Sequence, residues 1–420
     1  MPFLNYLDPA SVEPDDLVDR EAPLAWLRQG LDSYLRAPKT APGRAFSILG
    51  EKGVGKSLLT HKVVADLRQI HLATTLFLDV DCRRFRNQRA VYGEIARQAV
   101  DQLAPRADVH EPLLATARIL ETIAKYDDVE RRVIHEHLVQ HKAALQLKGP
   151  KALIGFLGAS YDISMQRGRQ SRETLEGSIS FDPPRLREAV IDFFHDVRAG
   201  ADFDILLVLD NVDELDHDAI RSEEARARCR GETDGLLGLT HAKIGLILTM
   251  RTYFAGILGR EVDEPTVLTR LSPADHVALV RGRLTRESAE IQQEFAQAPC
   301  VRGIERLAEL APTPLALLKW LRYLSERNLH TTEDAATALR GLLTDRYAQI
   351  RESVIEAVVR EFDISNAPVS RDRLVAACEG DEGKFAQLLR YQILLPVDFW
   401  YPYEFTLTPE LHFLLAAREG

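Results

Sequence analysis

Gly50-Glu51-Lys52-Gly53-Val54-Gly55-Lys56-Ser57 is the stretch of sequence that decides the fold. It follows the apolar run 45–49 and precedes Leu58-Leu59-Thr60, which reads as the beginning of a helix. The order of strand, glycine-rich turn and helix is the setting of a phosphate-binding P-loop. The glycines let backbone N–H groups curl around an anion, and the helix adds the positive end of its dipole. We therefore expect Lys56 to reach the β- and γ-phosphates of a nucleotide and Ser57 to ligate Mg²⁺.

The composition is that of an ordinary globular protein. The chain has 420 residues, of which 45% are hydrophobic and 28% charged, with a net charge of -10. This length favours two or three domains. No run approaches eighteen apolar residues, so we expect no membrane span. No signal peptide is evident at 1–5, and the four cysteines lack a Cys-x-x-Cys spacing, which predicts a cytoplasmic location.

Apolar runs separated by helical segments run through the first part of the chain. The strand candidates are 45–49, 74–80, 204–209 and 243–249, and an amphipathic helix is expected at about 23–35. Continuous apolar strands of this kind are typical of a buried parallel sheet. The sequence therefore predicts an α/β fold in which helices flank the parallel sheet of a P-loop NTPase.

The rest of the sequence predicts how the chain divides into domains. We assign 1–270 to a P-loop ATPase core, with a mostly helical insertion at about 105–182 that includes a helix over 111–147. Residues 271–342 are predicted to form an all-α lid. In 343–420, three helices precede two short β runs at 393–397 and 403–407, which is the pattern of a winged helix.

A second half of the site is expected at the ends of neighbouring strands. A P-loop needs a carboxylate there to hold Mg²⁺ through water. Asp210 ends the apolar strand at 204–209 and is predicted to be this metal-side acid, while Asp213 or Glu214 is expected to polarise the attacking water. The next strand ends in Thr249-Met250-Arg251, where Arg251 is expected to contact the γ-phosphate.

With these motifs the chain resembles the AAA+-related P-loop ATPases, nearest to the STAND class (NB-ARC and NACHT proteins) and the origin-initiator ATPases. Asp19-Arg20-Glu21 looks like the Gly-Arg-Glu motif that lies against the adenine, with Asp19 replacing the glycine. Asp210-x-x-Asp213-Glu214 is similar to the acidic motif of NACHT proteins, and 249–251 resembles the Thr-Thr-Arg sensor. The run 311–317 looks like the Gly-Leu-Pro-Leu-Ala motif of the lid, whose proline touches the base.

The resemblance implies an ATPase that binds ATP or ADP with Mg²⁺. Its implied catalytic residues are Lys56, Asp210, Asp213, Glu214 and Arg251, and its metal ligands are Ser57 and Asp210. Its implied nucleotide-binding residues are Arg20, Gly50, Gly53, Val54, Gly55, Lys56, Ser57, Leu58 and Pro314. Initiators place an arginine in the lid against the γ-phosphate; the segment 311–317 has proline and no arginine, which favours the STAND-like type.

Three functions fit these expectations. We favour a nucleotide-dependent switch that assembles with a separate protein partner, and many bacterial relatives of this type act in defence systems. The alternative is a DNA-binding initiator- or transposition-type AAA+ ATPase, and a third is a protein that binds nucleotide structurally and barely hydrolyses it. Residues 343–420 hold eight Lys/Arg against thirteen Asp/Glu, which disfavours DNA at the winged helix. DNA would instead meet the Arg83–Arg89 cluster or the loop 164–180, and the resemblance leaves homo-oligomers open.

Overall fold

The core of the molecule is a parallel sheet, as expected from the apolar runs. The computed structural model describes residues 17–125, 128–130, 178–180, 183–200, 203–215, 223–258, 262–263, 265–311, 313–326, 350, 352–363, 365–391, 393–397, 402–408 and 411. A five-stranded sheet has the order β2-β5-β6-β1-β7, and its neighbouring strands pair in parallel. The strands are β1 (Arg44–Gly50), β2 (Thr75–Asp81), β5 (Asp204–Asp210), β6 (Gly245–Met250) and β7 (Thr266–Leu268). The predicted α/β fold is confirmed.

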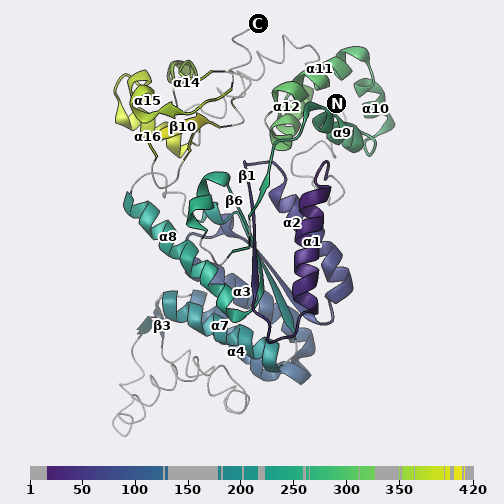
Figure 1. The fold of residues 1–420 in the computed structure, drawn as a ribbon, viewed down its shortest axis with the longest axis vertical. Helices are drawn as coiled ribbons and strands as arrows, with labels where there is room; N and C mark the ends of the chain where they lie inside the picture. Colours follow the sequence, from purple (N-terminus) through teal and green to yellow (C-terminus); the bar gives the residue numbers. More distant parts are fainter. Residues whose placement is uncertain are drawn as a thin grey trace.

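Helices cover both faces of this sheet (Figure 1). On one face lie α1 (Glu21–Arg36) and α2 (Lys56–His71); on the other lie α3 (Gln88–Leu103), α4 (Ala107–Lys125), α7 (Pro183–Gly200) and α8 (Glu223–Leu237). In β5, Leu206 and Val208 pack with the first group, and Leu207 and Leu209 pack with the second. Because both faces are buried, the strand has no polar alternation, and this explains its continuous apolar sequence.

The elements after β7 form two further groups, which lie at the upper end of the sheet in Figure 1. The first contains α9 (Pro273–Leu284), α10 (Ala289–Phe295), α11 (Ala298–Leu310) and α12 (Pro314–Glu326). The second contains α14 (Glu352–Val359), α15 (Arg371–Ala377), α16 (Glu382–Arg390) and an antiparallel sheet of β8 (Val369–Ser370), β10 (Glu404–Leu407) and β9 (Leu394–Pro396). Buried side chains of both groups, among them Trp320 and Phe405, belong to one hydrophobic cluster.

Three features differ from the sequence prediction. The sequence predicts a helix over 111–147, and this prediction is wrong at 128–130. The helix α4 ends at Lys125, and β3 (Asp128–Glu130) pairs with β4 (Ser178–Ser180). Strands β7 and β8 were not predicted, since three and two residues are too short to carry a periodic signal. The rest of the predicted insertion, 131–177, lies outside the described residues.

None of the helices in the described ranges has the length and apolar character that crossing a bilayer requires.

Replacing Ile247 by Ala tests the burial of the sheet face that packs against α1 and α2. Ile247 is 0% exposed on β6, so the change should lower the free energy of unfolding by about 2–5 kcal/mol through lost contacts and a cavity. Ile70→Ala is the matched control, because Ile70 is 62% exposed and should change stability by no more than about 0.5 kcal/mol. Urea denaturation measures both, and equal losses would contradict this packing.

Candidate nucleotide site

The P-loop joins β1 to α2 in a conformation that its glycines permit. Gly53 and Gly55 have φ values of +86° and +101°, in the left-handed region where a side chain is strained. Gly55 is the N-cap of α2 and supplies no side-chain cap, so the amides of the first turn face the loop. Backbone donors at a helix start are a ready binding site for phosphate.

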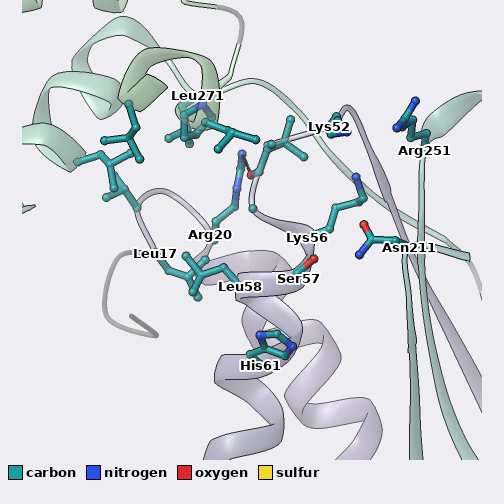
Figure 2. Close-up of a pocket in the computed structure, with 18 of the residues that line it drawn as sticks. Leu17, Arg20, Lys52, Lys56, Ser57, Leu58, His61, Asn211, Arg251 and Leu271 are labelled. Atoms are coloured by element: carbon teal, nitrogen blue, oxygen red, sulfur yellow. Dashed lines mark hydrogen bonds between the residues drawn. The ribbon is translucent and has the colours of Figure 1, made fainter. Parts of the chain in front are cut away.

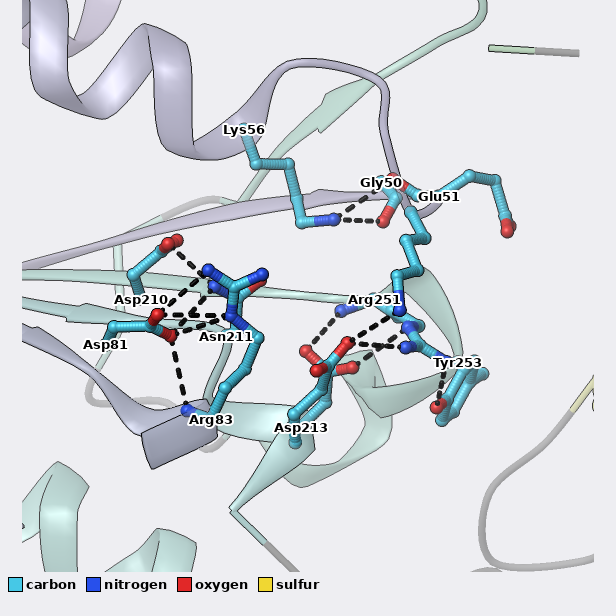
Figure 3. A network of polar contacts seen from close by, with 12 residues as sticks. Gly50, Glu51, Lys56, Asp81, Arg83, Asp210, Asn211, Asp213, Arg251 and Tyr253 are labelled. Carbon is cyan, nitrogen blue, oxygen red and sulfur yellow. Dashed lines mark hydrogen bonds and ion pairs between the residues drawn. The ribbon is translucent and has the colours of Figure 1, made fainter. Parts of the chain in front are cut away.

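Lys56 is turned toward this loop. Its Nζ donates to the carbonyl oxygens of Gly50 at 2.9 Å and Glu51 at 3.0 Å (Figure 3). The side chain is buried, and burial lowers the pKa of the ammonium group, although Asp213 opposes that change. A desolvated ammonium group beside backbone donors is well suited to a phosphate.

The carboxylate of Asp210 joins the start of α2 to the sheet. Asp210 Oδ1 accepts from Ser57 Oγ at 3.0 Å and also from Thr249 Oγ1. Asn211 Nδ2 donates to Asp210 Oδ2 at 2.7 Å, and Asn211 N donates to Thr249 Oγ1 at 2.9 Å. A serine hydroxyl beside a carboxylate is the donor set with which P-loop NTPases hold Mg²⁺. Within the described residues no three His, Cys, Asp or Glu side chains form a group that could hold a metal ion.

A buried ion cluster forms the wall opposite Asp210. Arg251 Nε lies 3.1 Å from Asp213 Oδ2, and Arg251 Nη2 lies 2.7 Å from Glu214 Oε1. Lys52 Nζ of the P-loop lies 3.5 Å from the same Glu214 oxygen. The cluster therefore links the loop to the turn after β5 and to the end of β6 (Figure 3).

The two acids of this cluster differ in their electrostatics. Burial raises the pKa of Asp213, against the opposing effect of Arg251. Burial would also raise the pKa of Glu214, but Lys52 and Arg251 outweigh it and the net pKa is lowered. Asp213 also accepts a hydrogen bond from the backbone N–H of Arg251 at 3.2 Å, so this acid fixes both the main chain and the side chain of Arg251.

The groups enclose a cavity of about 670 Å³ between the P-loop and the lid helices (Figure 2). One part of its lining is apolar: Leu17, Val18, Val54, Leu58, Leu271, Leu279, Pro314, Leu315 and Leu318. The other part is polar: Arg20, Lys52, Lys56, Ser57, His61, Arg83, Asn211, Asp213, Glu214, Arg251 and Arg283.

Arg20 joins the P-loop to the segment that connects β7 to the lid. Its Nη2 donates to the carbonyl oxygens of Val54 at 3.2 Å and Thr269 at 2.7 Å. Asp19 before it has φ +51°, the left-handed conformation that explains why the related motif carries glycine there. Arg20 thus contacts main chain on both sides of the cavity.

The lid also touches the P-loop directly. Leu315 N donates to Gly53 O at 3.3 Å, at the start of α12. A Cβ atom added to Gly53 would lie 2.4 Å from Leu315 Cβ, so only glycine fits this contact. Pro314 lies in the same lining, where the resemblance expected it.

The structure gathers the predicted site residues around one cavity, though their roles remain predictions. Gly50 and Asp210 adjoin it through the bonds to Lys56 and Ser57, and the others line it. The sequence missed the contribution of Lys52, Asn211 and His61, and it missed Arg283 of α9, a buried lid arginine in the lining. The segment 311–317 contains no arginine, but Arg283 brings an arginine to the cavity from α9, so the absence at 311–317 does not by itself separate the STAND-like type from the initiators.

The cluster Arg83–Arg89 is not a uniform basic surface. Arg83 lines the cavity, and Arg84 and Arg86 are exposed. Arg89 is buried, and its Nη2 donates to Ile123 O at 2.8 Å near the end of α4. Arg89 therefore stabilises the packing of α3 on α4 and cannot serve a DNA backbone. The other proposed DNA contact, 164–180, lies outside the described residues except for β4.

Gly53→Ala should separate the lid from the P-loop. The new methyl group meets Leu315 and the φ of +86° is strained, so thermal stability and nucleotide affinity should both fall. Gly282→Ala on α9 is the control, because nothing lies within 4 Å of its added Cβ and alanine favours a helix by about 1 kcal/mol. Thermal denaturation and titration with a fluorescent nucleotide measure the effects. Identical behaviour of the two variants would contradict the contact.

His61→Gln should alter the pH dependence of stability. His61 Nε2 lies 3.4 Å from Asp79 Oδ2, and this hydrogen bond raises the pKa of the imidazole. The stabilisation is therefore fully present below the unfolded pKa of about 6.5 and is lost as pH rises through the folded pKa. The melting temperature of the wild type should exceed that of His61→Gln by more at about pH 6 than at about pH 8. A difference that does not vary with pH would refute the pairing.

Comparisons with known proteins give one family match and several structural likenesses. Residues 17–224 match the model of the AAA ATPase domain family. The ORC1 protein of Aeropyrum pernix, solved in complex with DNA, aligns with a TM-score of 0.50 and 14% identity over 100% of this chain and 98% of that chain. Cdc6p of Pyrobaculum aerophilum aligns with a TM-score of 0.43 and 15% identity, covering 99% of this chain and 98% of that chain. The ADP form of Aeropyrum pernix ORC2 aligns with a TM-score of 0.46 and 11% identity, covering 100% of this chain and 97% of that chain.

The search of curated protein sequences returns no significant match. At its low identity the likeness to ORC1 shows the fold, and the family match covers the P-loop and Asp210. Residues 17–224 are therefore similar to the AAA ATPase domain family, and the chain has the P-loop α/β fold with a helical lid.

Proposed function

We propose that this chain binds and hydrolyses Mg·ATP and acts as a nucleotide-dependent conformational switch. The observation that carries the proposal is the 3.0 Å contact between Ser57 Oγ and Asp210 Oδ1, beside a buried Lys56. This contact unites the phosphate-binding loop with the metal-side acid at one end of the sheet. Such an arrangement supports phosphoryl transfer chemistry, in which catalysis is mainly positioning and electrostatic stabilisation.

Each polar wall of the cavity has a role in this proposal. Lys56 and the amides of 53–57 bind the phosphates, and Ser57 and Asp210 hold Mg²⁺, which neutralises charge on the phosphates when bound. Asp213 positions Arg251, because it contacts both the backbone N–H and the side chain of that residue. Glu214 is the acid that orients water, because it lies at the cavity wall between Lys52 and Arg251.

The contacts of Arg20 and Leu315 support coupling between nucleotide and lid. Arg20 joins the P-loop to Thr269, just before the lid, and Leu315 of α12 donates to the P-loop carbonyl of Gly53. In this proposal a change in loop conformation therefore moves the lid. We propose a lid at 271–342 and a winged helix at 343–420. Three helices and the three-stranded order β8-β10-β9 support the winged helix.

The partner that the fold favours is DNA. The likeness to ORC1, a protein solved with DNA, extends over the whole chain and supports the initiator-type alternative over the STAND type. The described surface of α15 and α16 argues against contact there, since its basic residues are paired with acids: Arg371 with Glu382, Arg373 with Glu361 and Lys384 with Glu379. An exposed arginine outside the winged helix, Arg86, is better placed for a phosphate backbone. A separate protein partner is the second candidate, favoured by this same neutralised surface.

ATP turnover with and without duplex DNA tests the proposal. The wild type should bind and hydrolyse ATP, and Lys56→Ala should lose both, because it removes the buried cation of the loop. Lys62→Ala, on the same helix but paired with Asp66 away from the cavity, is the matched control and should retain turnover.

Stimulation by DNA that fades with added salt would support the initiator type, and turnover indifferent to DNA would direct the search to a protein partner. Wild-type protein that binds no nucleotide would refute the function. Glu214→Ala with unchanged turnover would refute its role in orienting water.

A further inference from the structure

Arg83 occupies a position in the cavity that no motif assigns to it. It lies in the short 3₁₀ turn η2 (Cys82–Arg84) directly after β2, the strand that pairs with β5. Among the arginines of 83–89, all of which the structure describes, Arg83 alone lines the cavity. The register pairs Asp81 with Asp210, so Arg83 leaves the sheet beside the metal-side acid.

Asp81 holds the guanidinium group of Arg83 in one orientation. Arg83 Nε donates to Asp81 Oδ1 at 2.9 Å and to Oδ2 at 3.2 Å, and Arg83 Nη2 donates to Oδ2 at 2.8 Å. The side chain is nonetheless 50% exposed, so the fixed group remains open to the cavity. A planar guanidinium group has donors on more than one edge and binds phosphate through two of them at once.

The same aspartate connects Arg83 to Asp210. Asn211 Nδ2 donates to Asp81 Oδ1 at 3.3 Å and to Asp210 Oδ2 at 2.7 Å (Figure 3). Hydrogen bonding to Asp81 raises the pKa of Arg83, and the charges of Glu214 and Asp210 act in the same direction. The cation is therefore held among carboxylates, where it stays charged.

We propose that Arg83 binds the terminal phosphate of bound ATP from the Asp210 side and so favours ATP over ADP. This inference rests on the proposed binding of Mg·ATP in the cavity. Lys56 approaches from the P-loop and Arg251 from the end of β6, and Arg83 adds a cation from the end of β2. Because Asp81 fixes its orientation, little side-chain entropy is lost when the phosphate binds.

Nucleotide selectivity tests the inference. Wild type, Arg83→Ala and the control Arg86→Ala are titrated calorimetrically with ADP and with a non-hydrolysable ATP analogue, each with Mg²⁺. Arg83→Ala should weaken the ATP analogue by about 10- to 100-fold, the effect of losing one charge-assisted contact, and should change ADP affinity by less than about 3-fold. Arg86→Ala, exposed and outside the cavity lining, should change neither affinity.

A second variant separates phosphate binding from a structural role. Arg83→Lys keeps the charge but loses the two-point pairing with Asp81, so its loss of analogue affinity should be smaller than that of Arg83→Ala. If Arg83→Ala does not fold, the lysine variant alone decides, and an unchanged preference for the analogue over ADP overturns the inference. Equal weakening of both nucleotides, or of neither, in Arg83→Ala also overturns it. A wild type that binds neither nucleotide refutes the proposed function instead.

Discussion

One carboxylate oxygen joins three elements of this molecule. Asp210 Oδ1, at the end of β5, accepts hydrogen bonds from Ser57 at the start of α2 and from Thr249 on β6. The bonds are possible because a parallel sheet brings the carboxyl ends of its strands to one edge. This oxygen fixes the relative positions of the P-loop, the acidic turn after β5 and the end of β6. The buried leucines on both faces of β5 hold that edge in place.

Much of the fold was predictable because its signals are local. The continuous apolar runs predicted four of the five strands in the main sheet, and the glycine spacing predicted the P-loop. The strand β7 was not predicted, because its three residues are held to the sheet mainly by pairing with β1, and that contact leaves no local sequence pattern. The long helix predicted over 111–147 failed at β3 for a similar reason, since its partner strand β4 begins at Ser178.

The site was predictable in its residue types and not in its contacts. Asp213, Glu214 and Arg251 were all named from the sequence, but their mutual pairing depends on the adjacency of β5 and β6. The bond from Arg20 to Thr269 O spans 249 positions of sequence. Charge patterns were the least informative signal. The run 83–89 was predicted as a basic cluster, yet it contains Arg89, whose partner is the end of α4.

The backbone amide of Leu315 is placed to report the motion of the lid relative to the P-loop. Its hydrogen bond to Gly53 O belongs to neither the helical ladder of α12 nor the loop alone. Exchange of this proton with solvent therefore requires the lid to leave the P-loop, whereas amides further along α12 exchange when the helix itself opens. Deuterium uptake at this one position reports how often the cavity opens, without a label at the site.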